Sequence, residues 1–381
     1  MWWMNEERQM IAAAAREFAE QEVRPAAKLM EEEEKYPEAA IRKLGELGML
    51  GLTIKEEYGG AGADYVNYGL MIEELAKESH GFGLLAYLAS ELTLGLIEKM
   101  GTPEQVKDLI AKGLTGEKIY GICFTEPCGV GNPMEYETRA VLDGDEWVIN
   151  GGKIFITNAD IADTFFVIAK TSDYNPATMT GLTFFVVPSD TPGLTVGHIE
   201  NKLGWKGSHT GQLYFKDVRI PKDAIIGAVD NAWLPLNVAL LPMFATYGPM
   251  NLGAMETIFQ KTLVFLKSRV QCGVSLWDAH ESIRIDMMKM FLKIDNYRSA
   301  VYSALEDENR GENISAKAVA LKMQGADLLE EIASQCIELH GGTGTVYETG
   351  IERFYRDAKM GTVGCGSNRT LINSLASMIF Q

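Results

Sequence analysis

The stretch that organises this chain lies near its C-terminus and reads Glu352-Arg-Phe-Tyr-Arg-Asp-Ala-Lys-Met-Gly-Thr-Val-Gly-Cys-Gly-Ser-Asn-Arg369. Its first part has the alternating charges of an amphipathic helix, and an apolar helix is expected to follow over residues 371–380. Between them, Gly364 and Gly366 flank Cys365, so the backbone can approach a ligand closely while presenting one side chain to it. We therefore expect this loop to form one wall of a binding site.

Composition and charge narrow the class of protein. The 381 residues can form two or three packed domains, and 46% hydrophobic with 23% charged residues is ordinary for a globular protein. A net charge of -17 argues against binding nucleic acid or an anionic membrane through a basic surface. The N-terminus lacks signal-peptide features, and no apolar stretch is expected to reach membrane-spanning length. The five cysteines form no CxxC pair, so no metal site or disulfide framework is indicated, and a cytoplasmic location is expected.

The pattern of the chain changes twice along its length. Residues 1–120 are rich in helix formers, and within the expected helix 84–99 the side chains of Tyr87, Glu91 and Gly95 share one face at i, i+4 spacing. Residues 121–230 alternate in short apolar runs between turn signals, which is typical of an antiparallel β-sandwich or barrel. Residues 231–381 return to helices, expected at 236–268, 282–306, 316–340 and 371–380. The predicted fold class is α+β, with an N-terminal all-α domain, a middle β domain and a C-terminal four-helix bundle.

Seven short motifs follow one another in the order of a known family. They are Phe124-Thr-Glu-Pro127, Lys153-Ile-Phe-Ile-Thr-Asn158, Gly204-Trp-Lys-Gly-Ser-His209, Phe215-Lys-Asp-Val-Arg-Ile-Pro221, Arg269-Val-Gln-Cys-Gly273, His340-Gly-Gly-Thr-Gly344 and Glu352-Arg-Phe-Tyr-Arg-Asp-Ala-Lys359. Together they resemble the motifs of the FAD-dependent acyl-CoA dehydrogenases over essentially the whole chain. The resemblance implies noncovalent FAD, a CoA thioester substrate, an electron-transfer flavoprotein as electron acceptor and a homotetramer.

The resemblance also implies a flavin site between the β block and the C-terminal helices, largely at a subunit interface. Thr125 and Thr157 would donate hydrogen bonds to the flavin ring, and Phe155, in place of the family's Trp, would offer an apolar face. Without the motifs, Phe155 would be read as core and Thr157 as a surface residue. The other implied cofactor residues are Arg269 and Gln271, Glu338, the close-approach glycines Gly341 and Gly342, and Ser367 and Asn368, while the implied substrate residues are Glu91, Gly131, Ser208 and Gly366.

Several positions depart from the family's pattern. Glu338 stands where the family has Gln, Cys272 where it has Phe, and Cys128-Gly-Val-Gly131 where it has G-A-G-S. The family's Asp-x-x-Arg on the first bundle helix is Leu241-Pro-Met-Phe244 here. CoA recognition is therefore expected to be altered.

The family's catalytic base is missing from the C-terminal loop. In these enzymes a carboxylate removes the α-proton of the thioester while the β-hydrogen leaves as hydride to the flavin. That carboxylate is usually the Glu of a Y-E-G-T loop, and the matching residue here is Cys365. A relocated family base on the first bundle helix matches Met243. Cys365 is either an active thiol or a small apolar filler, and the filler interpretation is favoured because an ordinary thiol, with a pKa of about 8.5, is a poor base.

Glu91 is the candidate for a substitute base, because its segment resembles the helix that lines the family's acyl pocket. An acid among Leu, Ala and Thr is costly to bury without a role, although a wet helix face is the alternative. From that wall a carboxylate could take the γ-proton of a conjugated enoyl-CoA and give a 1,4-type dehydrogenation. The chain is similar here to the anaerobic alicyclic acyl-CoA dehydrogenases that act on cyclohex-1-ene-1-carboxyl-CoA, and the small residues at 364–366 leave room for a ring.

Two other functions stay open. One is a conventional α,β-dehydrogenase with a relocated base. The other is a non-redox, desulfinase-like acyl-CoA lyase that keeps FAD structurally.

Overall fold

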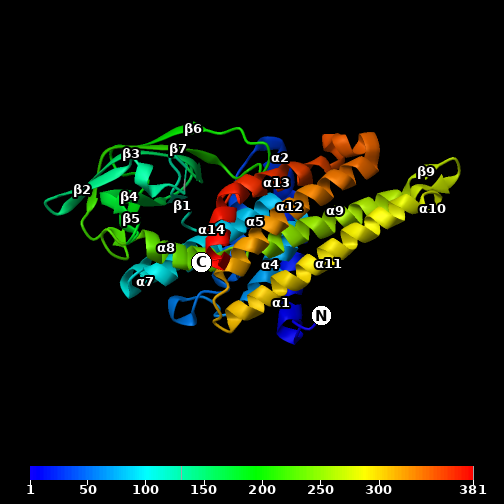
Figure 1. The fold of residues 1–381 in the computed structure, drawn as a ribbon, viewed down its shortest axis with the longest axis horizontal. Coiled ribbons are helices and arrows are strands. Elements are labelled where there is room, and N and C mark those ends of the chain that lie inside the picture. The colour runs from blue at the N-terminus through cyan, green and yellow to red at the C-terminus, as the bar shows by residue number, and fades with distance from the viewer. Residues whose placement is uncertain (130, 381) are drawn as a thin grey trace.

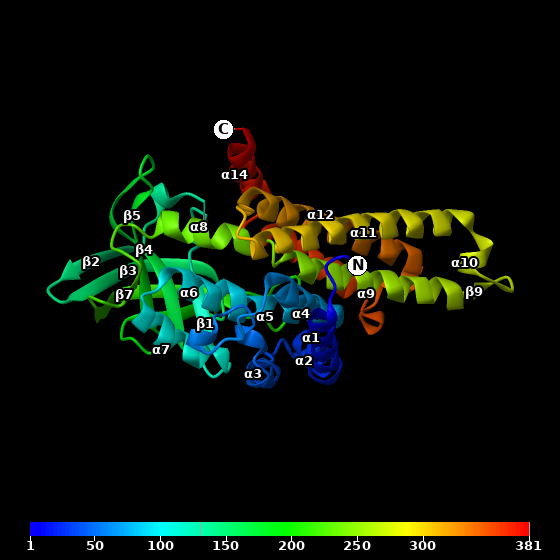
Figure 2. The same ribbon diagram turned by 90° about the horizontal axis from the view of Figure 1, so that it is seen from below.

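The computed structural model describes residues 1–129 and 131–380. The strands lie at one end of an elongated molecule, and the long helices α9 (Gly248–Ser268), α11 (Glu281–Asn309) and α12 (Ser315–His340) run towards the other end (Figure 1). The N-terminal helices pack across the middle, as the perpendicular view in Figure 2 also shows. The order of helices, strands and helices is the predicted one.

Helices build the chain as far as Leu114. Local signals start two of them: the Asn5 side chain accepts the N–H of Arg8, and Thr102 and Gln105 form a capping box before Pro103. The helices are α1 (Glu6–Phe18), α2 (Arg24–Glu33), α3 (Glu38–Glu46), α4 (Tyr65–Glu78), α5 (His80–Tyr87), α6 (Leu96–Met100) and α7 (Pro103–Leu114), with a π-helical segment at Ala19–Val23 and 3-10 turns at Met49–Gly51 and Glu56–Tyr58.

The segment that joins α5 to α6 is a π-helix, Leu88–Gly95, which the i, i+4 pattern did not predict. The Thr93 hydroxyl donates to the carbonyl of Leu88, five residues back, at 2.6 Å. A π-turn holds more residues than an α-turn, so side chains four apart no longer lie directly above one another. The faces predicted for residues 84–99 are therefore shifted.

The continuous helical run His80–Met100 also corrects the expectation about membrane-spanning length. At 21 residues it is long and apolar enough to cross a membrane by length and composition alone. However, 83% of its apolar window is buried inside the protein, which is the behaviour of a core helix.

Strands β1 to β8 form one sheet, in which seven strands follow the order β6-β7-β3-β2-β4-β5-β8 and β1 pairs with β4 off this path. Most pairs are antiparallel, but β1 pairs with β4 in parallel along four residues, which the alternating pattern did not predict. The strands are β1 (Tyr120–Cys123), β2 (Arg139–Asp143), β3 (Glu146–Thr157), β4 (Thr164–Asn175), β5 (Thr180–Pro188), β6 (Leu194–Ile199), β7 (Thr210–Pro221) and β8 (Ile225–Ile226).

The C-terminal helices differ from expectation in one place. The helix expected over residues 236–268 is broken between Met243 and Gly248, because Pro242 sits near the end of α8 and Pro249 near the start of α9. After α12 come the short α13 and then α14, which projects away from the body in Figure 2. The further elements are α8 (Trp233–Met243), the hairpin β9 (Val270–Gln271) and β10 (Val274–Ser275), α10 (Leu276–Ala279), 3-10 turns at Gly341–Thr345 and Tyr347–Thr349, α13 (Glu352–Val363) and α14 (Asn368–Phe380).

The N-terminal helices are fixed to the C-terminal ones by buried polar and aromatic contacts. Arg298 of α11 forms an ion pair with Glu73 of α4 at 2.6 Å, and both side chains are less than a tenth exposed. The Trp3 ring stacks on Tyr302 with ring centroids 4.8 Å apart. Helices give way to strands between Leu114 and Tyr120, whereas the exact domain limits stay predictions.

Candidate active site

A cavity of about 590 Å³ lies where the π-helix, strands β1 and β3, α8 and the start of α14 meet. Segments far apart in the sequence contribute to it. Of the residues predicted for the site, those that line the cavity are Thr125, Gly131, Phe155, Thr157, Cys365 and Gly366. The T-E-P turn, the K-x-F-I-T-N strand and the C-terminal loop therefore share one pocket.

Phe155 faces this cavity because strand β3 is bulged at that point. The pairing of β3 with β7 shifts register between Lys153 and Ile156, and Phe155 has a left-handed φ of +55°. The bulge takes the ring out of the sheet's alternation, and Phe155 remains 61% exposed. An exposed aromatic ring in the wall of a cavity is a platform for a flat ligand.

The wall that carries Phe155 is braced by a buried ion pair between two family motifs. Lys153 Nζ lies 2.7 Å from Glu126 Oε1, and the two side chains are 0% and 1% exposed. Glu126 also accepts the N–H groups of Glu137 and Thr138, at 2.6 and 3.2 Å. Burial lowers the pKa of Lys153, while the carboxylate of Glu126 opposes that change. The Glu of T-E-P and the Lys of K-x-F-I-T-N thus hold the wall in place.

The C-terminal loop closes another side of the cavity with a strained turn. Cys365 has a left-handed φ of +52° and is followed by Gly366 at +83°. Beneath the loop the buried Lys322 donates to the Gly366 carbonyl at 2.5 Å and to Asn368 Oδ1 at 3.1 Å. Burial lowers the pKa of Lys322 to about 8 and raises that of the Cys365 thiol. Cys365 is therefore a neutral thiol at neutral pH, which agrees with the filler interpretation.

Trp205 explains why residue 364 is a glycine. A Cβ at Gly364 would lie 2.5 Å from the Trp205 ring, so this ring occupies the space into which a side chain would project. The backbone N–H of Trp205 donates to Asp357 at 2.6 Å, and its indole N–H donates to His80 Nδ1 at 2.9 Å. His80 Nε2 lies 3.1 Å from Asn251 Oδ1. The G-W-K-G motif and the Asp of R-D-A-K therefore support the loop from behind.

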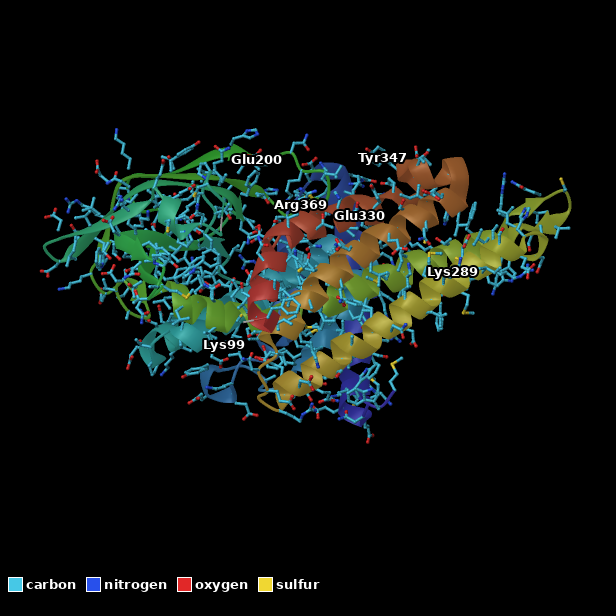
Figure 3. All side chains as sticks on the ribbon, viewed as in Figure 1. Lys99, Glu200, Lys289, Glu330, Tyr347 and Arg369 are labelled. Atoms are coloured by element: carbon cyan, nitrogen blue, oxygen red, sulfur yellow. The ribbon has the colours of Figure 1, made fainter. Side chains whose placement is uncertain are left out.

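Glu91 does not line the cavity, which corrects the expectation that its carboxylate faces the acyl pocket. Its side chain is 1% exposed and accepts a hydrogen bond from Thr53 at 2.8 Å, and Lys99 Nζ lies 3.5 Å from its other oxygen. A Cβ on Gly95 would meet the same carboxylate at 3.2 Å. Lys99, labelled in Figure 3, belongs to α6 at the outer end of this helical run. The π-helix explains the shift, because the neighbours of Glu91 reach the cavity instead.

Several predicted residues lie away from this cavity. Ser208 is buried beside Trp205, and its carbonyl accepts from Lys202. Ser367 bonds Thr370, and Asn368 is held under the loop. Strand β9, which follows Arg269 directly, lies at the opposite end of the molecule from the sheet in both views (Figures 1 and 2). The predicted cofactor residues of that part of the bundle are all exposed and outside the cavity: Arg269, Gln271, Glu338, Gly341 and Gly342.

The sequence also gave no role to much of the cavity wall. Tyr87 lines it from the start of the π-helix, and the nearest predictive signal was its place on the same expected face as Glu91. The wall formed by α8 and α14 carries apolar, amide and hydroxyl side chains, which composition alone cannot separate from ordinary core and surface residues. These lining residues are Trp233, Leu236, Asn237, Leu240, Leu241, Phe244, Thr370, Leu371, Asn373 and Ser374.

Comparison with known proteins gives the family. The acyl-CoA dehydrogenase N-terminal, middle and C-terminal domains match residues 5–117, 121–218 and 245–380. The short-chain-specific acyl-CoA dehydrogenase of Clostridium acetobutylicum is 32% identical over 379 residues, which is 99% of each chain. The human mitochondrial short-chain-specific acyl-CoA dehydrogenase is 32% identical over 94% of this chain and 86% of that protein. The solved butyryl-CoA dehydrogenase of Megasphaera elsdenii has a TM-score of 0.93 at 27% identity, with 99% of each chain covered.

The chain therefore belongs to the acyl-CoA dehydrogenase family, and it is an oxidoreductase with the predicted fold. Acyl-CoA dehydrogenases are FAD flavoproteins, so FAD is its cofactor. The cavity suits a flavin ring, because the exposed Phe155 stands beside the hydroxyls of Thr125 and Thr157. The buried Asn158 Oδ1, also in this wall, has no hydrogen-bond partner among the described residues and is free to accept one.

Proposed function

We propose that this enzyme dehydrogenates a cyclic or bulky acyl- or enoyl-CoA, with cyclohex-1-ene-1-carboxyl-CoA to a conjugated diene-CoA as the best candidate. One observation carries the proposal. Among the described residues that line the cavity none is Asp or Glu, and a neutral thiol, Cys365, stands where the family has its base. A saturated thioester therefore has no carboxylate at its α-carbon, and of the two loop glycines only Gly366 lines the cavity, because the Trp205 ring fills the space beside Gly364.

The residues proposed to contact the flavin would hold its ring in place and take no part in proton transfer. In this proposal Phe155 supports the ring, and Thr125 and Thr157 donate hydrogen bonds to it. FAD, when bound, supplies the hydride acceptor. Gly131, Gly366 and the apolar wall of α8 shape the space for the acyl group and exclude water, which strengthens the polar interactions inside. Arg269, Gln271, Glu338, Gly341 and Gly342 would hold the cofactor of a second copy, since they lie outside this chain's own cavity.

Glu91 is the proton acceptor we propose, and its reach depends on a rotation of its side chain. Its neighbours Leu88 and Leu92 line the cavity, and its Oε1 makes no hydrogen bond among the described residues. The proposal requires the carboxylate to turn away from Thr53 and Lys99 towards the cavity that Leu88 and Leu92 line. The γ-proton of an enoyl-CoA is acidified through the conjugated double bond. Loss of the γ-proton from C3 to Glu91 and of a hydride from C6 would replace the C1=C2 double bond by C2=C3 and C1=C6, so one proton and one hydride leave for a net gain of one double bond.

An electron-transfer flavoprotein is the proposed electron acceptor. Support comes from a solved chain with a TM-score of 0.93 and 30% identity to this one. That chain belongs to a structural study of the electron transferring flavoprotein of Acidaminococcus fermentans. A homotetramer is also proposed, because the projecting α14 exposes Ile372, Ile379 and Phe380. The expected cytoplasmic location stays part of the proposal.

A panel of CoA thioesters tests the substrate. The FAD-loaded enzyme is mixed anaerobically with butyryl-CoA, cyclohexane-carboxyl-CoA and cyclohex-1-ene-1-carboxyl-CoA while the flavin absorbance is followed. We expect rapid bleaching with the cyclohexene thioester only. Rapid bleaching with butyryl-CoA would favour a conventional α,β-dehydrogenase with a relocated base. Turnover of a thioester without any bleaching would favour the acyl-CoA lyase.

A further inference from the structure

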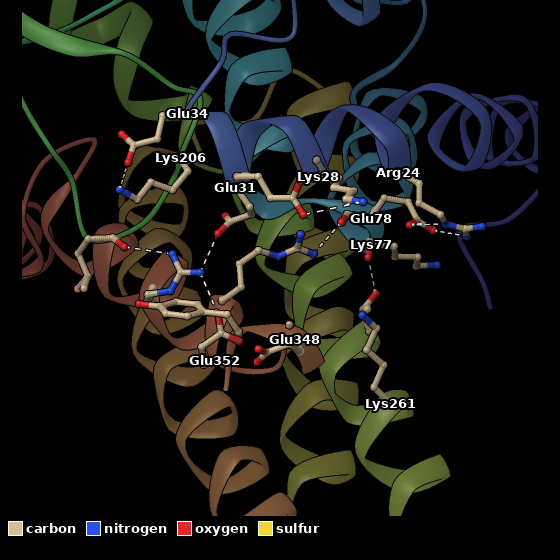
Figure 4. A pocket seen from close by; sticks show the side chains of 18 of the residues that line it. Arg24, Lys28, Glu31, Glu34, Lys77, Glu78, Lys206, Lys261, Glu348 and Glu352 are labelled. Carbon is tan, nitrogen blue, oxygen red and sulfur yellow. Dashed lines mark hydrogen bonds and ion pairs between the residues drawn. The ribbon is translucent and has the colours of Figure 1, made fainter. Parts of the chain in front are cut away.

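A second and larger cavity, of about 1020 Å³, lies outside the flavin pocket. It is enclosed by α2, the loop that precedes β7, the middle of α9 and the start of α13 (Figure 4). No residue lines both cavities among those described. The proposed dehydrogenation therefore gives it no role.

The charge of this cavity differs from that of the whole chain. Eight Lys and Arg side chains and six Glu side chains line it, although the protein carries a net charge of -17. Four of the cations pair with a carboxylate of the same wall, as the dashed lines in Figure 4 show in part, and Lys77 pairs with Glu74 outside the wall at 2.8 Å. The four pairs within the wall are Arg24 with Glu78 at 2.7 Å, Lys28 with Glu32 at 3.9 Å, Lys206 with Glu34 at 2.5 Å, and Arg356 with Glu31 and Glu352 at 2.7 and 2.9 Å.

Three lining cations remain without a carboxylate among the described residues: Lys202, which donates to the Ser208 carbonyl and to Thr210 Oγ1, and the pair Lys261 and Arg353. Within residues 1–129 and 131–380 neither Lys261 nor Arg353 forms an ion pair, and the one hydrogen bond of the Arg353 guanidinium goes to the Glu78 carbonyl at 3.0 Å. Both charges approach the Phe354 ring, with Lys261 Nζ at 5.6 Å and Arg353 Cζ at 5.5 Å from its centroid. Burial first, and then the charge of Arg353, lowers the pKa of Lys261. Two neighbouring cations in a concave wall, most of their N–H groups free, form a receptor for phosphate oxygens.

Tyr347 adds a flat surface to the same wall. Its side chain is 77% exposed, and the Arg356 guanidinium lies 5.5 Å from the ring centroid. Tyr347 is labelled in Figure 3 at the edge of the molecule, on the segment between α12 and α13. A ring open on one side and supported by a guanidinium on the other can stack on a nucleobase.

We propose that this cavity binds a nucleoside polyphosphate, with phosphates on Lys261 and Arg353 and the base on Tyr347. The site is separate from the flavin and acyl cavity and is independent of the substrate proposed above. The ligand is either a free nucleotide or the nucleotide end of CoA, because phosphates and a base are the recognised groups in both.

Calorimetric titration of the FAD-loaded enzyme tests this site with ADP and with inorganic pyrophosphate as probes. We expect both to bind, and the double variant Lys261→Gln/Arg353→Gln to bind each about tenfold more weakly or worse. Tyr347→Ala should weaken ADP and leave pyrophosphate unchanged. The matched control is Lys359→Gln, which removes a charge that α13 carries outside the cavity, paired with Glu330 at 3.1 Å. Thermal unfolding of each variant checks that it is folded.

Further titrations distinguish a free nucleotide from CoA as the ligand of this cavity. Repeating the ADP titration with excess CoA identifies the source: competition assigns the site to the nucleotide end of CoA, and independent binding assigns it to a free nucleotide. No binding of ADP or pyrophosphate to the wild-type enzyme overturns the proposal. Equal weakening by Lys359→Gln would also overturn it, because the attraction would then be one of general charge. A change of oligomeric state in the double variant, with no probe bound by the wild type, would assign the cations to a contact between copies instead.

Discussion

Replacing Lys153 by Met tests whether the buried pair with Glu126 supports the flavin wall. The substitution keeps an unbranched apolar side chain but leaves Glu126 charged in a site where it is 1% exposed. Glu126 keeps its bonds from the Glu137 and Thr138 N–H groups, so it cannot relax into solvent. Removing one partner of a buried ion pair costs about 3–5 kcal/mol, and we expect a loss of that size in the free energy of unfolding.

The effect should reach the cofactor as well as the stability. Ile154 N–H donates to the Thr125 carbonyl at 2.9 Å, so the strand with Phe155 and the T-E-P turn move together. We therefore expect weaker FAD binding in Lys153→Met. Urea unfolding at one fixed excess of FAD, followed by circular dichroism and by tryptophan fluorescence, measures the stability.

A double variant, Glu126→Gln/Lys153→Met, is the control. It removes the stranded charge and should recover at least about 1 kcal/mol of the loss, because a neutral amide costs less to bury than a carboxylate. A loss below about 1 kcal/mol in Lys153→Met would refute the bracing role, by the usual size of a buried-pair disruption. So would a double variant as unstable as the single one.

Three further predictions concern the supports of the site. The Trp205 indole N–H donates to His80 Nδ1, and burial lowers the pKa of His80 to about 4. As the pH falls, His80 therefore takes up a proton in the unfolded chain before it does so in the folded protein. The free energy of unfolding should fall by about 3 kcal/mol between pH 6.5 and pH 4, and a His80→Gln variant should show a flatter profile in urea titrations at each pH. Cys365→Glu should raise the rate of flavin bleaching by butyryl-CoA at least about tenfold, with Cys365→Gln as the inactive control in the same anaerobic mixing assay. Phe155→Ala should raise the dissociation constant of FAD about tenfold in fluorescence titrations and leave the urea midpoint of the apoprotein almost unchanged, since the ring is 61% exposed.

The fold, and the position of several site residues in one cavity, could be predicted because several short motifs agree with one another. Thr125, Phe155, Thr157 and Cys365 were each ambiguous alone, yet their order along the chain placed them in one pocket. The structure also shows how the T-E-P turn and the K-x-F-I-T-N strand are joined behind this pocket. Glu126 and Lys153, which carried no predicted role, form the buried pair behind that pocket.

The direction in which the Glu91 side chain points could not be predicted, because it depends on the π-helix Leu88–Gly95. Helical periodicity assumes i, i+4 spacing, and nothing in Leu88-Ala-Ser-Glu91 signals the wider turn that directs Leu88 and Leu92 to the cavity. The bulge that turns Phe155 outwards is equally hidden, since it is a property of the pairing between β3 and β7.

The space behind the C-terminal loop could not be predicted either, because it depends on contacts across the whole chain. Gly364 and Gly366 were expected to let the backbone approach a ligand closely on either side of Cys365. The structure shows that the Trp205 ring, brought from the loop before β7, fills the volume of any side chain at residue 364. The contacts of exposed predicted cofactor residues such as Arg269 are equally hard to predict from one sequence, because the cofactor they would bind would lie on another copy of the chain.

The central claim is that a carboxylate outside the C-terminal loop accepts the proton, and Glu91→Gln tests it most directly. The FAD-loaded variant is mixed rapidly and anaerobically with cyclohex-1-ene-1-carboxyl-CoA, beside wild type and Glu98→Gln. Glu98 is a carboxylate of α6 that accepts the N–H of Lys55 at 3.0 Å. The account predicts that flavin bleaching slows by about a hundredfold or more in Glu91→Gln, with FAD content retained and Glu98→Gln unaffected. Bleaching of Glu91→Gln at the wild-type rate would contradict it.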